Sequence, residues 1–97
     1  AAATPTVLSF RGLSQVDGLA AFELGLPYPA EVRLTLFDIA GRAVACLMDG
    51  MLPAGVHEYP VSSALVGRLS SGIYFGRAEI HSAAIRDVRT ARIRLIR

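Results

Sequence analysis

Short runs in which apolar and polar residues alternate cover most of this chain. The clearest run spans residues 31–38, in which Val32, Leu34 and Leu36 have one parity and polar residues mostly have the other. Successive side chains of a β-strand point to opposite faces, so this pattern predicts a strand with one face in a core. Outside residues 64–69, no window has the three- and four-residue apolar spacing of a long helix.

Six further segments have the residue types or the alternation of strands. The predicted strands are residues 6–11, 19–26, 31–38, 42–48, 55–62, 72–81 and 88–96. Pro60 lacks an amide hydrogen and places the segment 55–62 at a sheet edge. The segment 42–48 is apolar at both parities, which predicts either two covered faces or a bulge. Residues 62–69 are consistent with a helical turn or a loop.

Turn residues separate these runs at short intervals. In the Asp-Ile-Ala-Gly-Arg stretch, Gly41 can adopt the positive φ of a tight reversal, which predicts a β-hairpin. We expect the Asp38 side chain to accept hydrogen bonds from the turn amides, and Arg42 to lean on the adjacent strand. Further turns are predicted at Gly50, Gly55 and Gly72.

Closely spaced turns between short alternating runs predict an all-β fold, a two-sheet antiparallel β-sandwich of about seven strands. The 97 residues fit one domain, 1–97. Residues 1–5 have the composition of a tail, which we expect to lie on its own domain or on a neighbour. Residues 6–11 are predicted to be either an edge strand or a strand donated to a neighbouring molecule.

Composition limits the chemistry. All ten basic residues are arginine, and the formal net charge of only +2 argues against a nucleic-acid binder. No apolar run reaches the length of a membrane span. His57 and His81 lie far apart without other ligands nearby, so we expect no metal site and no cofactor. No residues in a catalytic arrangement are present, and Cys46 is expected to be a buried, inert thiol.

Some side chains are candidates for an interface. Arg92 and Arg94 share a parity, and we expect them to form cross-strand ion pairs with nearby glutamates, Glu23, Glu31 or Glu79. Phe37 has the opposite parity to Leu36 and is expected to face outward. The predicted interface residues are Val7, Leu8, Phe10, Phe37, Arg92 and Arg94.

Several motifs together resemble one known family. They are the Asp38-to-Arg42 turn, the segment Ala54-Gly55-Val56-His57 and the strand start Ser71-Gly72-Ile73-Tyr74-Phe75. The chain from about residue 22 to residue 97 resembles the immunoglobulin-like domain of the flagellar hook-capping protein. It is also similar to the C-terminal sorting domains of the type IX secretion system. The resemblance implies an immunoglobulin-like sandwich.

The resemblance also implies a non-enzymatic module, secreted by a bacterium and placed outside the cell or on its surface, that sorts or anchors by binding protein. An alternative hypothesis is a subunit of an extracellular filament, held by sheet-edge pairing or by donation of an N-terminal strand. The absence of lysine, a common guard of exposed edges, motivates this alternative. A third hypothesis is a carbohydrate-binding module that uses outward aromatic rings.

Overall fold

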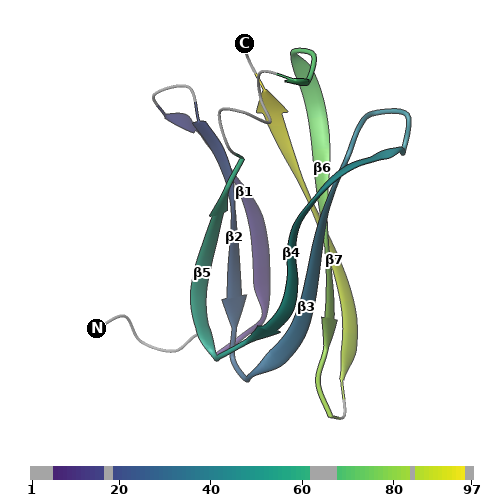
Figure 1. The fold of residues 1–97 in the computed structure, drawn as a ribbon. Helices are drawn as coiled ribbons and strands as arrows, with labels where there is room; N and C mark the ends of the chain where they lie inside the picture. The colour runs from purple at the N-terminus through teal and green to yellow at the C-terminus, as the bar shows by residue number, and fades with distance from the viewer. Residues whose placement is uncertain (1–5, 17–18, 62–67, 84, 96–97) are drawn as a thin grey trace.

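In the part of the chain that the structure describes, seven antiparallel strands form two sheets that lie face to face (Figure 1). The computed structural model describes residues 6–16, 19–61, 68–83 and 85–95. The prediction of an all-β, two-sheet sandwich is therefore confirmed. The predicted tail, residues 1–5, and most of the segment 62–69 lie outside the described residues. Among the described residues, no helix has the length and apolar character needed to cross a membrane.

The seven strands of the described residues are divided between the two sheets. They are β1 (Ser9–Val16), β2 (Leu19–Leu26), β3 (Ala30–Phe37), β4 (Ala43–Leu52), β5 (Gly55–Pro60), β6 (Gly72–His81) and β7 (Arg86–Leu95). One sheet has the order β1-β2-β5 and the other has the order β4-β3-β6-β7. In an immunoglobulin constant-type sandwich the fourth strand pairs with the fifth, whereas here it pairs with the third. The four-stranded sheet is therefore the broader of the two.

Several strands differ in extent from the predictions. β1 begins later than residue 6 and continues past residue 11, where this strand was predicted to end, to Val16. β4 continues to Leu52, so Gly50 lies inside this strand, opposite Val32, and the turn predicted at Gly50 is wrong. β3 begins one residue earlier than predicted, at Ala30, and pairs with β4 along the whole length of β4. The chain leaves β4 only at Pro53, which has no amide hydrogen to donate.

β4 contains the bulges that its apolar pattern allowed. Its register with β3 shifts between Leu34 and Thr35 and again between Leu36 and Phe37. Each shift leaves one extra residue on β4, so the simple alternation of faces breaks down. One consequence is that Cys46 is exposed, and the expectation of a buried thiol is wrong. From Met48 to Leu52 the ladder is regular.

The core lies between the sheets and is built from the predicted apolar faces. In β3 the burial alternates residue by residue, with Val32, Leu34 and Leu36 fully buried. The other large side chains that are fully buried are Phe22, Leu24, Leu26, Val61, Ile80 and Leu95. No polar or charged residue is buried among the described residues. Apolar burial is therefore the main driving force that holds the two sheets together.

Two glycines allow the sheets to approach each other closely. A Cβ atom at Gly12 of β1 would fall on the carbonyl oxygen of Arg92 in β7, so the edges of the two sheets touch at this seam. A Cβ atom at Gly76 would meet the ring of Phe22, which stacks on Phe10 with ring centroids 5.4 Å apart. The sheet edge formed by β1 is thus packed against the edge formed by β7.

Candidate functional site: the outer face of the four-stranded sheet

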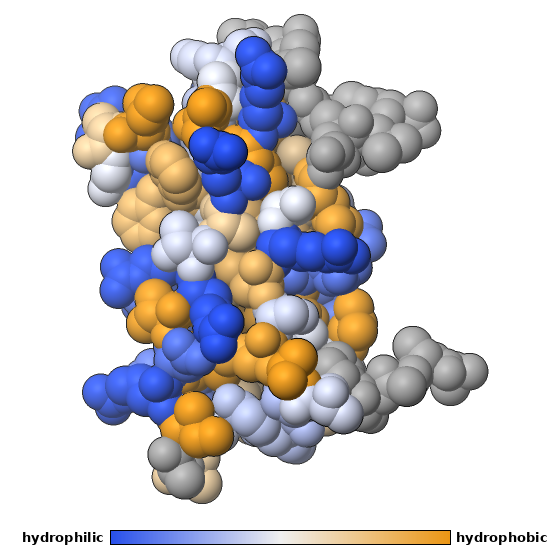
Figure 2. Space-filling view, turned by 180° about the vertical axis from the view of Figure 1, so that it is seen from behind, coloured by the Kyte–Doolittle hydropathy of each residue, from blue (hydrophilic) through white to orange (hydrophobic). Residues whose placement is uncertain are grey.

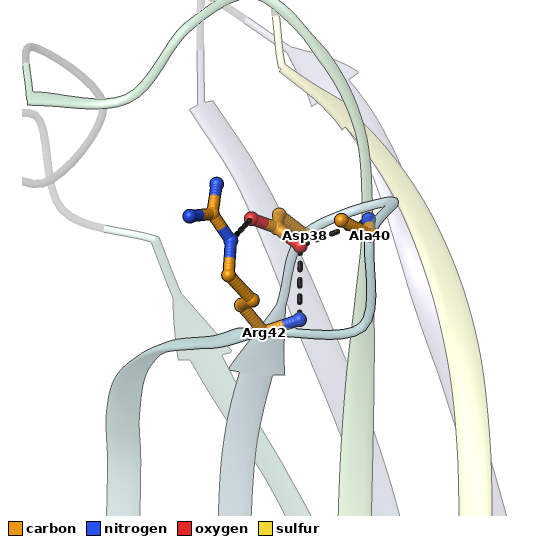
Figure 3. Close-up of polar contacts among 3 residues, drawn as sticks. All are labelled: Asp38, Ala40 and Arg42. Atoms are coloured by element: carbon orange, nitrogen blue, oxygen red, sulfur yellow. Dashed lines mark hydrogen bonds and ion pairs between the residues drawn. The ribbon is translucent and has the colours of Figure 1, made fainter.

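The turn between β3 and β4 is held by its own hydrogen bonds (Figure 3). Oδ1 of Asp38 accepts hydrogen bonds from the backbone amides of Ala40 and Arg42, both at 2.9 Å. The amide of Gly41 donates to the carbonyl oxygen of Asp38, and Gly41 has a φ of 84°, which favours glycine. The carboxylate of Asp38 is therefore a structural acceptor that closes the turn.

Arg42 differs from its predicted position. Its Nε donates to Oδ2 of Asp38 at 3.2 Å, and the side chain is otherwise exposed instead of lying on the neighbouring strand. The hydrogen bond from the backbone amide of Arg42 holds the pKa of the Asp38 carboxyl below its usual value. Desolvation opposes this shift, and the hydrogen bonds from the Arg42 guanidinium and from the amide of Ala40 lower the pKa further.

Replacing Asp38 with alanine is expected to destabilise the protein in a pH-dependent way. Because folding lowers the pKa of Asp38, the ionised carboxylate adds to the free energy of unfolding. This stabilisation is fully present above the unfolded-state pKa of about 3.9 and is lost as the pH falls through the folded-state pKa. Urea unfolding should thus show a lower free energy of unfolding for Asp38→Ala than for wild type at neutral pH, and this difference should shrink in acid. Glu58→Ala, at an exposed position of β5, is the control; an equal gap for both variants would contradict this prediction.

The outer face of the four-stranded sheet brings together residues that are distant in sequence. Phe37 of β3 lies opposite Phe75 of β6, and Phe75 lies opposite Arg92 of β7. All three have the parity opposite to the buried residues of their strands. Tyr74, the neighbour of Phe75, instead lies in the core and donates its hydroxyl to the carbonyl oxygen of Ser70 at 2.8 Å. Two phenyl rings therefore face outward on adjacent strands.

A shallow hollow lies on this face beside the β3–β4 turn. It has a volume of about 330 Å³ and is lined by Phe37, Asp38, Ile39, Gly41, Phe75, Arg77 and Thr90. Ile39, at the tip of the turn, is 77% exposed. Together, Phe37, Ile39, Phe75, Arg77 and Arg92 form what we call the aromatic–arginine patch. In Figure 2, hydrophobic residues lie in separate groups among hydrophilic ones, with one group at the upper left, on the side of the β3–β4 turn.

The predicted ion pairs of Arg92 and Arg94 are absent from the described residues. In the register of β6 and β7, Arg92 lies opposite Phe75 and Arg94 lies opposite Ile73. The glutamates pair elsewhere, Glu23 with Arg11 at 2.9 Å and Glu79 with Arg77 at 3.4 Å. Within the part of the chain that is described, the guanidinium groups of Arg92 and Arg94 thus remain available to a partner.

The other predicted interface residues lie on the three-stranded side of the sandwich. Val7 is 68% exposed, but Leu8 and Phe10 are half-buried against the core. Phe10 contributes to its own domain by stacking on Phe22. The predicted interface residues therefore do not form one surface, and only Phe37, Arg92 and Arg94 share a face.

Candidate ligand-binding side chains are scattered. His57 lies on β5, with its Nε2 2.8 Å from the carbonyl oxygen of Pro53, to which it donates. Glu31, Arg33, Asp49, Glu79 and His81 line a second, charged hollow at the opposite end of the outer face. Among the described residues, no group of three or more His, Cys, Asp or Glu side chains is arranged to hold a metal ion.

Sequence reasoning missed Phe75, Ile39 and Arg77 as members of one surface. Phe75 has the parity opposite to Tyr74, but the sequence did not show which of the two belonged to the core. Only the antiparallel register of β3 and β6 sets Phe37 beside Phe75. No family model matches the chain, and no curated protein matches it.

Proposed function

We propose that this chain is a non-catalytic interaction module that acts outside a bacterial cell by binding another protein through the aromatic–arginine patch. The observation that carries the proposal is the adjacency of Phe37 and Phe75 on an outward sheet face, next to Arg92. Aromatic residues and arginine are enriched at protein–protein interfaces, whereas lysine is depleted there. The resemblance to sorting and anchoring domains supports this role.

The chemistry of the patch favours a partner surface that combines apolar side chains with carboxylates. Phe37, Ile39 and Phe75 offer apolar area. Arg92 of the patch, and Arg94 beside it on β7, have no ion-pair partner among the described residues. Guanidinium groups bind carboxylates through two parallel hydrogen bonds and also stack on aromatic rings. A partner of this kind would satisfy both parts of the patch.

The test is a reporter fusion in a bacterium that has a type IX secretion system. Residues 1–97 are joined to the C-terminus of a secreted reporter, and surface-bound reporter is measured on intact cells. We expect the fusion to be exported and retained, and the reporter without the domain to be neither. Equal amounts of surface reporter with and without the domain would contradict the sorting role.

The same pair of rings supports carbohydrate binding as a second candidate, because exposed aromatic side chains can stack on sugar rings. Affinity electrophoresis through gels that contain polysaccharide would separate the two candidates. If carbohydrate is the ligand, the protein should be retarded, and Phe37→Ala should abolish the retardation. Unchanged mobility in every polysaccharide would reject this candidate and leave protein binding.

A further inference from the structure

Two open sheets leave four edge strands, and an edge strand presents unpaired N–H and C=O groups to other chains. The edges are β1 and β5 in one sheet and β4 and β7 in the other. Three of these strands carry features that hinder further pairing. β5 has only six residues and ends at Pro60. β1 is packed against β7 at Gly12, and β7 carries Arg86, Arg89, Arg92 and Arg94.

β4 has less protection, because its two bulges leave its second half unhindered. It is ten residues long, and Asp49 is its only charged residue. Its outward side chains include exposed Cys46 and Met51, the latter 67% exposed. Both bulges lie in the first half of the strand, and the half from Met48 to Leu52 keeps a regular ladder. The half from Met48 to Leu52 is thus a regular and almost uncharged edge, and such an edge is the kind that pairs with another strand.

We propose that β4 pairs antiparallel with β4 of a second copy of this chain. The product is one eight-stranded sheet of order β7-β6-β3-β4-β4-β3-β6-β7, with a two-fold axis at its centre. In Figure 1, β4 lies at one edge of its sheet with β3 on its inner side. The proposal goes beyond the function proposed above, because it concerns an edge of the sheet, whereas the aromatic–arginine patch lies on its face.

Charge favours a second copy as the occupant of this edge. When two β4 strands overlap fully, Asp49 of one copy lies opposite Cys46 of the other, so no like charges meet. β7 instead carries Arg86, Arg89, Arg92 and Arg94, so pairing two copies of β7 would bring several like charges close together, which is unfavourable. At the centre of the overlap, Leu47 and Met48 of the two copies face one another. Both are only partly buried against the core of one chain, and pairing would cover them further.

A two-fold pairing of this kind closes on itself. Because both copies use the same strand, the contact is isologous and produces a dimer, not a filament. A filament would need a second free edge, and the three other edges carry the hindrances described above. The structure therefore favours a dimer over the filament hypothesis.

Light scattering after size-exclusion chromatography, under reducing conditions, measures the outcome. We expect a mass twice the 10.3 kDa of one chain at high concentration. Cys46→Lys combined with Met51→Lys adds two charges to the outer face of β4 and is expected to weaken dimerisation by about tenfold or more. Val88→Lys with Thr90→Lys, which adds the same charge to the outer face of β7, should leave the dimer intact.

Three results would overturn the proposal. They are a wild-type monomer at every concentration, equal dimerisation of the two double variants, and a wild-type mass that grows beyond two chains. Circular dichroism must show that both variants keep their strands. If the β4 variant does not fold, the distance between spin labels on Cys46 of two copies decides the question with no substitution.

Cys46 is the only cysteine, so a nitroxide label can be attached to the unmodified chain. In the fully overlapped pairing the two Cys46 Cα atoms are separated by three residues along the strands, or about 11 Å including the strand spacing. Pulsed electron paramagnetic resonance should therefore give a short label-to-label distance, and dilution with unlabelled chain should remove the dipolar signal. Labels farther apart than the ~33 Å length of a ten-residue strand would exclude β4 pairing.

Discussion

Replacing Phe22 with alanine is expected to lower the free energy of unfolding by about 4 kcal/mol. Phe22 is fully buried, its ring stacks on Phe10, and the space beside Gly76 is filled by this ring. Truncation would leave a cavity between the two sheets that the strands cannot close without breaking their ladders. For a domain of 97 residues, this loss is a large part of a total stability of about 5–15 kcal/mol. Urea unfolding followed by circular dichroism measures it.

The control for this substitution is Phe75→Ala. Phe75 is of the same residue type but faces outward on β6, so its truncation should cost about 1 kcal/mol or less. The difference between the two variants reports directly on which phenylalanine lies between the sheets. Equal destabilisation by the two variants would contradict the assignment of the faces.

Replacing Gly12 with valine is expected to destabilise the protein by about 2 kcal/mol or more, by forcing β1 away from β7. The new Cβ atom would fall on the carbonyl oxygen of Arg92 and lie 2.8 Å from Cγ2 of Ile93. Because the first obstacle is backbone, a rotamer change cannot relieve the overlap. Thermal unfolding should show a lower midpoint than that of wild type.

Ser9→Val is the matched control for this second substitution. Ser9 lies on the same strand but is exposed, and valine suits a strand, so we expect its effect on stability to be small. A Gly12→Val protein as stable as Ser9→Val would show that β1 does not lie against β7. The contact between the two sheets would then not lie at Gly12.

The alternation of apolar residues predicted the fold because it has a direct physical cause. In β3, the residues of one parity are those that lie between the sheets, and the pattern needs no knowledge of the partner strands. The extents of β2 and β6 were predicted correctly for the same reason. Pro60 marked β5 as an edge because proline cannot donate to a ladder on its other side.

The features that were predicted wrongly depend on pairing between strands. Gly50 was expected to lie in a turn, but β3 provides partners along the whole of β4. Cys46 was expected to be buried, but the bulges in β4 change which residues face the core. Arg92 was expected to pair with glutamate, but the register sets Phe75 opposite it. The alternation of residues within one strand does not show which residues of another strand lie opposite them. The aromatic–arginine patch therefore could not be predicted from the sequence.

We propose that the aromatic–arginine patch is the contact surface through which this sandwich acts. The most direct test compares two double variants in the reporter fusion. Phe37→Ser with Phe75→Ser removes both rings of the patch. Ile85→Ser with Val88→Ser removes two other exposed apolar residues, 47% and 48% exposed, at the opposite end of the same sheet. We predict that both proteins fold and that only the patch variant loses surface retention. Full retention by a folded patch variant would contradict a role of the aromatic–arginine patch in surface retention.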